Sequence, residues 1–498
     1  MTKSSGDATL PSLLRSGVQG LDEVLGGGLT AERLYLIEGM PGSGKTTLAL
    51  QFLLEGVRNN EPVLYITLSE TRAELHSVAE SHGWTLDGIQ IHEVITSEDL
   101  LDPAQQHTLF HPSEVELGDT TRDISSIVEA NKPSRVVIDS LSELRLLASN
   151  PLRYRRQILA YKQFFARRAC TVLMLDDRPD THDMQIRSIA HGVIGLDQSD
   201  SDYGIGRRRL RVIKYRGMAS RDGYHDYKIR RGGVEIFPRL VAAETRVYGK
   251  RTFISTGIAA LDTQFGGGLE TGTSTMLGGP PGTGKSTLAA QFVAAAIARG
   301  DKAAMFIFEE STNILLNRCA GIGLDLAGAL KRGEVTIQQI DPAEMSPGEF
   351  TQRVCTSVVN HGARLIIIDS LNGYLNAMPN DRFLTLHLHE LLSYLGQREV
   401  TTVIVGVHQG ILGGNMSSTI DASYLADNVL LLRHFEYNGE VRQAVSVFKK
   451  RGSAHERSIR EYSIGPKGIH VGKVLHQFHG VLTGVPTFEG GKLDDDPQ

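Results

Sequence analysis

Two scarcities narrow the classes of protein to which this 498-residue chain can belong. Cysteine occurs only three times, at Cys170, Cys319 and Cys355, and these isolated positions give no C-x-x-C spacing. The pattern disfavours a zinc module or a disulfide framework and fits a reducing cytoplasm. No apolar run approaches the ~20 residues that cross a bilayer, and the polar residues 1–5 lack the core of a signal peptide. We therefore expect a cytoplasmic protein with no membrane partner.

An excess of positive charge is also missing, since the formal net charge is −5. That balance argues against nucleic acid as a main partner. The hydrophobic content of 41% and the charged content of 22% are those of a globular protein. The length exceeds what one core supports and suggests about two to four domains.

The chain contains one phosphate-binding signature, G-x-x-x-x-G-K-[ST], in two copies. In this P-loop the glycines turn backbone N–H groups toward phosphate oxygens, the following helix adds its dipole, and the lysine reaches the β- and γ-phosphates. The hydroxyls of Thr46 and Ser286 are placed to bind Mg²⁺. We therefore predict two ATP sites that use Mg²⁺. Their predicted residues are Gly39, Gly42, Ser43, Gly44, Lys45, Thr46 and Thr47, and then Gly279, Gly282, Thr283, Gly284, Lys285, Ser286 and Thr287.

The repeat extends well beyond these loops. Three consecutive glycines precede each P-loop, beginning at residue 26 in the first half and at residue 266 in the second. These triplets and the P-loop lysines are separated by the same number of residues between the halves, because 266 − 26 and 285 − 45 both equal 240. Apolar strands, acidic residues and basic segments then follow in the same order with small drifts in offset, which indicates a duplication. We predict four parts: an N-terminal tail (1–13), a first domain (14–246), a second domain (247–485) and an acidic C-terminal tail (486–498).

Helix-period segments alternate with short apolar strands in each half. Fully apolar strands such as residues 365–368 are typical of a parallel sheet that is buried on both faces. The pattern predicts an α/β fold in which each tandem domain has a mostly parallel, twisted sheet with helices on both faces. In such sheets phosphates bind at the carboxyl ends of the strands.

An aspartate ends one fully apolar strand in each half, at Asp139 and Asp369. A carboxylate at this place, downstream of a P-loop, is typical of a Walker B residue that holds Mg²⁺ through water. The alternative is a simple cap between strand and loop, since aspartate often follows strands. We predict the Walker B role for both residues.

Glutamates follow another strand, which we expect to neighbour the P-loop strand. Glu70 stands in the first half, and Glu309 and Glu310 stand in the second, where the first half has Ser69 at the position of Glu309. A carboxylate here can polarise a water or a hydroxyl for attack on the γ-phosphate. A solvated strand end is the alternative, but recurrence at the 240 offset favours a catalytic role for all three glutamates.

A basic strand recurs late in each half, with Lys214 and Arg216 in the first copy and Lys449 and Arg451 in the second. Alternation places each pair on one face of its strand. An exposed edge strand protected by charge would look the same. The repetition favours cations that are supplied to a phosphate, in the manner of an arginine finger from a neighbouring subunit.

With these parts assembled, the chain resembles the KaiC family, the double-domain RecA-like ATPases known from the cyanobacterial circadian clock. The resemblance covers about residues 14–485 and rests on the motif before each glycine triplet, the glutamates, and K-x-R-G followed by residues 453–455. It implies RecA-like P-loop domains and a homohexamer of two stacked rings with ATP between neighbouring subunits. It also implies an ATPase first ring, a second ring that phosphorylates itself on serine and threonine, and a KaiB-like or other signalling partner.

The resemblance assigns roles residue by residue. The two P-loop lysines and the hydroxyls of Thr46 and Ser286 match its nucleotide and magnesium positions, while Glu70 matches one of two glutamates in the first ring. The residues that it places against ATP of the adjacent subunit are Lys214, Arg216, Lys449, Arg451 and His455. The phosphoacceptor pair of the family falls on Ser423 and Tyr424, so the threonine is replaced and Ser423 is the candidate acceptor.

We predict an ATP-hydrolysing signalling protein that phosphorylates itself as a serine/threonine kinase. One alternative is an ATP-driven regulatory hexamer without kinase activity, which the tyrosine at position 424 favours. Another is a RecA-type DNA-dependent ATPase, against which the acidic balance argues.

Overall fold

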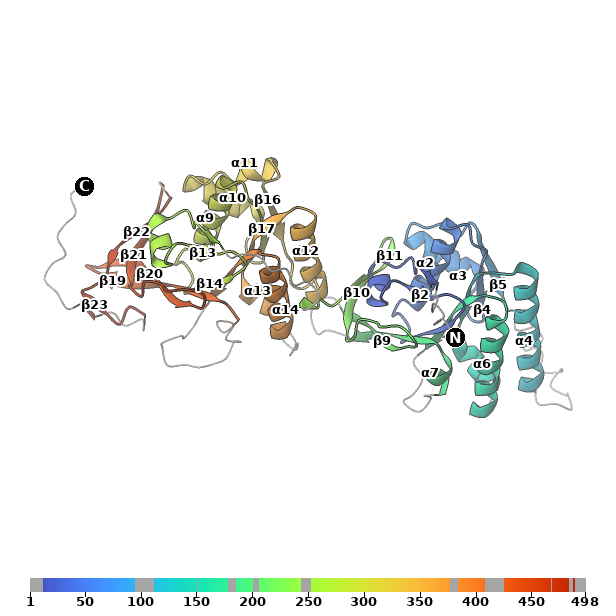
Figure 1. Ribbon diagram of the computed structural model, residues 1–498. Helices are drawn as coiled ribbons and strands as arrows, with labels where there is room; N and C mark the ends of the chain where they lie inside the picture. Colours follow the sequence, from blue (N-terminus) through green and yellow to red (C-terminus); the bar gives the residue numbers. More distant parts are fainter. Residues whose placement is uncertain are drawn as a thin grey trace, which may run out of the picture. The chain divides into compact units, whose positions relative to one another are not determined.

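The computed structural model describes residues 12–94, 112–148, 150–177, 185–199, 206–242, 252–376, 384–407, 425–466, 468–482 and 487–488. The chain divides into two compact units, Met1–Arg239 and Leu240–Gln498 (Figure 1). The boundary that the sequence predicts between residues 246 and 247 lies outside the described residues. Among the described residues, no helix combines the length and the apolar character needed to cross a bilayer.

Nine strands form the main sheet of the first domain. Across the sheet they are β11 (Gly233–Phe237), β10 (His225–Arg230), β9 (Arg207–Tyr215), β8 (Gly192–Ser199), β3 (Leu34–Gly39), β7 (Thr171–Asp177), β6 (Arg135–Asp139), β4 (Val63–Thr67) and β5 (Ile89–Glu93). The strands from β8 to β5 pair in parallel, and β9, β10 and β11 pair antiparallel at one edge. A separate two-stranded sheet joins β1 (Leu13–Leu14) to β2 (Leu29–Thr30).

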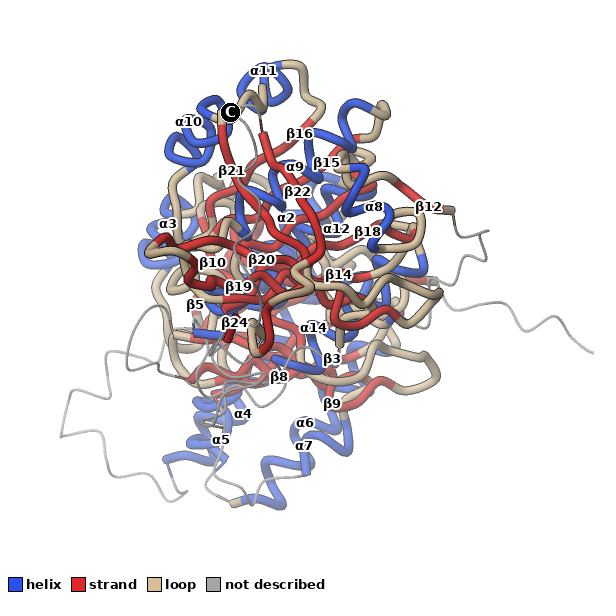
Figure 2. Tube along the Cα trace, turned by 90° about the vertical axis from the view of Figure 1, so that its left-hand side faces the viewer, coloured by secondary structure: helices blue, strands red, loops and turns tan. Residues whose placement is uncertain are grey.

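Helices cover both faces of this sheet because the side chains of each strand alternate between two buried cores. Tyr35 and Ile37 of β3 belong to one core, with α1 (Leu21–Val24), α2 (Lys45–Arg58) and α3 (Arg72–Ser81). Leu34 and Leu36 belong to the other core. The helices of that face are α4 (Pro112–Asn131), α5 (Leu141–Ala148), α6 (Pro151–Ala166) and α7 (Gln185–Ile189) (Figures 1 and 2).

The second domain repeats this order strand for strand. Its sheet runs β16 (Val335–Gln339), β15 (Lys302–Ile307), β17 (Ala363–Asp369), β18 (Thr401–Val407), β14 (Ser274–Gly279), β19 (Asn428–Tyr437), β20 (Glu440–Lys450), β21 (Arg460–Gly465) and β22 (Gly468–Val474). Two short sheets pair β12 (Phe253–Ile254) with β13 (Leu269–Glu270) and β23 (Phe478–His479) with β24 (Thr487–Phe488).

The helices of the second domain also divide between two cores. One core includes α8 (Ala259–Gln264), α9 (Lys285–Ala298), α10 (Thr312–Gly321) and α11 (Leu326–Lys331). The other includes α12 (Pro347–Val359), α13 (Leu371–Asn376) and α14 (Leu384–Gln397). The predicted fold class is therefore confirmed: two tandem α/β domains, each with a mostly parallel sheet between two layers of helices.

The P-loop connects the central strand of each sheet to a long helix, from β3 to α2 and from β14 to α9. Gly44 and Gly284 precede these helices in the left-handed region, with φ of 90° and 84°. A Cβ atom at either glycine would lie within 2.6 Å of an isoleucine Cδ1, that of Ile229 or Ile464. Only glycine meets both conditions, so the turn that exposes backbone N–H groups depends on it.

Candidate functional site

The P-loop residues that the sequence predicts lie together at the carboxyl edge of each sheet. The ammonium of Lys45 donates hydrogen bonds to the carbonyls of Gly39 at 2.8 Å and Met40 at 3.2 Å. Lys285 does the same with the carbonyls of Gly279 at 2.8 Å and Pro280 at 2.7 Å. Both lysine side chains are almost fully buried. Burial lowers the pKa of Lys285, and the carboxylates of Asp369 and Glu309 oppose that shift.

The predicted Walker B aspartate contacts the P-loop hydroxyl in both domains. Thr46 donates to Asp139 Oδ2 at 3.1 Å, and Tyr65 donates to the same oxygen at 2.6 Å. Burial raises the pKa of Asp139, while these two hydrogen bonds lower it. In the second domain, burial raises the pKa of Asp369 to about 6, and a hydrogen bond from Ser286 opposes the shift.

This pair of groups fits a magnesium ion. A hydroxyl and a carboxylate supply hard oxygen ligands, which Mg²⁺ prefers. Asp369 Oδ2 is buried and has no hydrogen-bond partner among the described residues, so that oxygen retains its capacity to bind a ligand. Groups of three or more His, Cys, Asp and Glu residues suited to a metal do not occur in the part of the chain that the structure describes. The likeness to a magnesium site therefore depends on one hydroxyl and one carboxylate in each domain.

The glutamates predicted to be catalytic lie at the same carboxyl edge, but not on the strand beside the P-loop strand. They follow β4 and β15, and two other strands separate each of these from β3 or β14. The expectation of neighbouring strands was therefore wrong, because crossover helices let consecutive strands occupy non-adjacent places in a sheet. β4 ends at Thr67, and a turn in which the Glu70 N–H donates to Thr67 Oγ1 at 2.9 Å carries the chain to the glutamate.

Glu70 is half-buried and its Oε2 has no hydrogen-bond partner among the described residues. Burial raises the pKa of this carboxyl to about 7, and the nearby carboxylates of Asp139 and Glu74 add to the shift. A carboxyl with this pKa changes its charge near neutral pH, which suits a group that exchanges protons. Glu70 therefore has a pKa that suits the role predicted for it.

In the second domain, Glu309 and Glu310 accept hydrogen bonds from residues that the sequence did not predict to belong to the site. Ser370 donates to Glu309 Oε1 at 2.5 Å. Arg318, from α10, donates to Glu310 Oε1 at 2.5 Å and to Thr287 Oγ1 at 2.8 Å. The only signal for Arg318 in the sequence is its spacing, since it lies eight residues after Glu310 within the next helix. The arginine therefore connects Glu310, at the carboxyl edge of the sheet, to the start of α9.

Further carboxylates, also missed from the sequence, surround the P-loop of the first domain. Asp177 at the end of β7 lies 2.8 Å from the Lys45 ammonium. Its neighbour Asp176 is buried and pairs with Arg145 at 2.6 Å, and burial raises the pKa of Asp176 to about 7. In the second domain the position of Asp177 is taken by Val407, because Gly39 pairs with Asp177 and Gly279 pairs with Val407. A strand that ends in Asp-Asp could have suggested this cluster.

The basic strand pairs lie at the opposite, amino edge of each sheet. Lys214 donates to the carbonyls of Arg187 and Ala190 at 2.5 and 2.7 Å, and Arg216 donates to that of Ser188 at 2.6 Å. In the second domain, Lys449 donates to the carbonyl of Ala426 at 2.8 Å. Both pairs are therefore remote from the P-loop of their own domain.

Arg451 and His455 are the other two residues that the sequence predicts to contact ATP of an adjacent subunit. Arg451 lies 3.8 Å from the Asp427 carboxylate. Burial, with Arg457 and Lys450, lowers the pKa of the half-buried His455. Ser423 and Tyr424 lie outside the described residues, so the candidate phosphoacceptor has no described position.

The chain is similar in sequence to known proteins along nearly its whole length. The family model for the KaiC ATPase matches residues 14–241 and 254–475. The circadian clock oscillator protein KaiC of Acaryochloris marina is 27% identical over 482 residues, which cover 94% of this chain and 90% of that protein. The circadian clock protein KaiC3 of a Synechocystis strain is 27% identical over 481 residues, with 95% and 94% covered. KaiC of Synechococcus elongatus is 26% identical over 486 residues, with 95% and 92% covered.

Proposed function

This chain belongs to the KaiC family of ATPases, and on that premise we propose that it hydrolyses ATP in both domains and phosphorylates itself on a serine of the second. The observation that carries the proposal is the recurrence of lysine, hydroxyl, aspartate and glutamate at the carboxyl edge of both sheets. Such an edge is where phosphates bind in open α/β sheets. Cytoplasmic ATP is the proposed substrate.

In the first domain, Lys45 would bind the terminal phosphates and Glu70 would orient the attacking water and accept its proton. The bond between the γ-phosphorus and the β,γ-bridging oxygen breaks while the water oxygen bonds to phosphorus, leaving ADP and phosphate. Thr46 and Asp139 would hold Mg²⁺, which when bound offsets the negative charge on phosphate oxygens. The pKa of Glu70 near 7 supports its role as proton acceptor.

In the second domain, the same chemistry has two carboxylates available. The contact of a hydroxyl with Glu309 at 2.5 Å illustrates that this carboxylate can accept a hydrogen bond from serine. An acceptor serine that replaced this contact would lose its proton to Glu309 as its oxygen bonds to the γ-phosphorus and ADP leaves. We propose Ser423 as that acceptor, and Lys285 as the group that binds the transferred phosphoryl.

Assembly into a homohexamer of two stacked rings supplies the remaining charges. Lys214, Arg216, Lys449, Arg451 and His455 would contact ATP held by an adjacent subunit, since they lie across the sheet from their own P-loop. ATP would then stabilise the ring by mass action, because it binds both partners only when they are assembled. Lys45→Ala should convert much of the hexamer to smaller species in sizing experiments. A KaiB-like or other signalling protein is the proposed further partner.

Incubation with labelled Mg-ATP followed by mass spectrometry tests the kinase. We expect one phosphate per chain on the peptide that contains Ser423, and no label in Ser423→Ala or in Glu309→Gln/Glu310→Gln. ATP consumption without any labelled peptide would instead support the second candidate, a regulatory ATPase hexamer without kinase activity. The specific observation that favours this second candidate is the tyrosine that follows Ser423 in place of threonine.

A further inference from the structure

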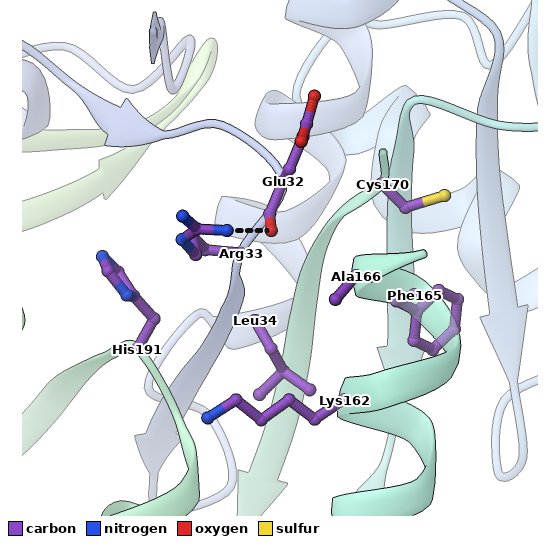
Figure 3. A pocket seen from close by; sticks show the side chains of 8 residues that line it. All are labelled: Glu32, Arg33, Leu34, Lys162, Phe165, Ala166, Cys170 and His191. Carbon is purple, nitrogen blue, oxygen red and sulfur yellow. Dashed lines mark hydrogen bonds between the residues drawn. The ribbon is translucent and has the colours of Figure 1, made fainter. Parts of the chain in front are cut away.

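A cluster of basic side chains, separate from the P-loop, lies at the amino edge of the first-domain sheet. A cavity of about 190 Å³ opens there between the starts of β3 and β7 and the last turns of α6. Its lining residues are Glu32, Arg33, Leu34, Lys162, Phe165, Ala166, Cys170 and His191. Figure 3 shows the nitrogen-bearing ends of Arg33, Lys162 and His191 gathered on one side, with Phe165 and Cys170 on the other.

Two more cations adjoin this cavity. Lys162 donates to the carbonyl of Ile189 at 2.8 Å, while Arg216 donates to that of Ser188 and Lys214 to that of Ala190. The three side chains therefore converge on consecutive carbonyls at the C-terminal end of α7. Arg33 and these three cations together lower the pKa of His191 to about 4, after the larger effect of burial. The histidine is thus neutral at pH 7, and the cluster contains four fixed positive charges.

Within the described ranges, none of Arg33, Lys162, Lys214 and Arg216 forms an ion pair, and Arg33 donates only to the backbone carbonyl of Glu32 at 3.2 Å. His191 Nε2 is buried and has no hydrogen-bond partner there either. Like charges held this close repel one another, and an anion bound beside them would offset that repulsion.

The second domain has the same backbone but not the same charges. The equivalent residues of the second domain are Thr273 for Arg33, Leu392 for Lys162 and Asp427 for His191. The last equivalence is seen in the backbone, because Arg216 N–H donates to the His191 carbonyl and Arg451 N–H donates to the Asp427 carbonyl. The Asp427 carboxylate lies 3.8 Å from Arg451 and accepts from Ser274 N–H at 3.0 Å. A carboxylate of the chain therefore pairs with the second basic strand, whereas Lys214 and Arg216 of the first form no ion pair among the described residues.

We propose that Arg33, Lys162 and His191 Nε2 form a binding site for a phosphate group, specific to the first domain, and that Lys214 and Arg216 add positive charge beside it. Several adjacent cations favour a multiply charged phosphate over a carboxylate, which carries one charge. The cavity is smaller than the ~300 Å³ at which sites for whole small molecules begin. It therefore suits inorganic phosphate or the phosphate end of a larger ligand.

The phosphate cannot come from the P-loop of the same domain. That loop lies at the other end of β3, and six residues of strand separate the two sites by roughly 20 Å. The source is either a free anion in solution or a nucleotide held by another copy of the chain. Both sources present the same chemistry, and two measurements distinguish them.

The first measurement is calorimetric titration with pyrophosphate at constant ionic strength, in the full chain carrying Lys45→Ala and Lys285→Ala. Lys162→Leu, which installs the second-domain residue, should weaken binding by roughly tenfold or more, the effect of one charge-assisted hydrogen bond. Lys162→Arg should retain binding. The matched control is Arg156→Leu, which removes an exposed cation from the same helix. Arg33→Thr provides a second variant at an exposed position.

The second measurement is the assembled fraction of the chain with intact P-loops, at a fixed concentration of a slowly hydrolysed ATP analogue. If another copy presents the phosphate, Lys162→Leu and Arg33→Thr lower this fraction and Arg156→Leu does not. If the chain does not assemble, the pyrophosphate titration alone decides whether the site binds phosphate. Equal behaviour of Lys162→Leu, Arg33→Thr and Arg156→Leu in every measurement that can be made would overturn the proposal. ATP turnover is not a readout, so failure here is distinguishable from failure of the proposed hydrolysis.

Discussion

The two domains have the same strand order and the same P-loop geometry, yet they surround the P-loop lysine with different charges. In the first domain Lys45 lies 2.8 Å from Asp177, and Glu70 has an unpartnered oxygen. In the second domain a valine replaces that aspartate, and Arg318 pairs with Glu310. A duplicated fold has thus diverged at its strand ends while its sheets have kept their order.

The physical reason is that the sheet and the strand ends are under different constraints. Strand interiors are buried on both faces, so alternation of apolar side chains fixes them in both copies. Residues after the strands contact loops and ligands, and a changed charge there leaves the core intact. We expect the two domains to differ in chemistry more than in stability of the sheet.

The largest expected difference concerns the glutamates. In a chain whose second P-loop is disabled by Lys285→Ala, Glu70→Gln should lower ATP turnover by ~10²–10⁴, because no second carboxylate replaces it. In the reverse background, Lys45→Ala, Glu309→Gln should cost less, since Glu310 remains. Steady-state phosphate release measures both. Turnover by Glu70→Gln at the rate of its parent would remove this residue from the mechanism.

The next difference between the domains concerns stability and lies at Arg135, a fully buried residue of β6. The equivalent residue of the second domain is Leu365 in β17. Its guanidinium donates to Glu61 Oε2 at 2.5 Å and to the carbonyl of Phe52 at 3.0 Å. Arg135→Leu should destabilise the first domain by about 3 kcal/mol, because these acceptors lose their donor.

Urea denaturation followed by tryptophan fluorescence measures this change, since Trp84 is the single tryptophan and lies in the first domain. The control is Arg58→Leu, which breaks an exposed pair with Glu55 at 3.0 Å and should cost less than about 1 kcal/mol. If the two variants unfolded at the same urea concentration, the first domain would tolerate leucine as the second does.

The pH dependence should differ as well. The raised pKa of Glu70, about 7, means that its carboxyl gains a proton as the pH falls through neutrality. Turnover by the first domain should therefore drop roughly tenfold from pH 8 to pH 6, because only the ionised form accepts a proton. Val78→Arg, at the position equivalent to Arg318, should shift the profile to lower pH. A flat profile for the Lys285→Ala chain would contradict the assignment of Glu70.

The smallest expected effect concerns Asp177. Asp177→Val, which installs the second-domain residue, should tighten ATP binding about two- to fivefold, the size of a partly exposed ion pair that ATP otherwise displaces from Lys45. Titration with a fluorescent ATP analogue in the Lys285→Ala background measures it. Asp119→Val, which removes an exposed carboxylate on α4, is the control and should leave affinity unchanged. Weaker binding by Asp177→Val would mean that Asp177 assists the nucleotide.

Local sequence was sufficient to predict the parts that depend on neighbouring residues. The glycines with positive φ before α2 and α9, the apolar strands and the aspartates at their ends all follow from short-range patterns. The offset of 240 shared by the glycine triplets and the P-loops, with the same order of later motifs, then predicted the duplication. Their prediction does not require knowing which segments, distant in the sequence, come into contact in the fold.

Tertiary structure alone decided which charges meet. Lys45 and Asp177 come together because β3 and β7 are adjacent in the sheet, although 132 residues separate them. The same crossovers place β7 and β6 between β3 and β4, against the expectation from chain order. The pKa of Glu70 and the cluster around Arg33 and Lys162 likewise depend on burial and on neighbours from other strands and helices. Periodicity reveals which face of an element is buried, but the strength of an electrostatic interaction is set by distance and solvent exposure, which only the assembled fold provides.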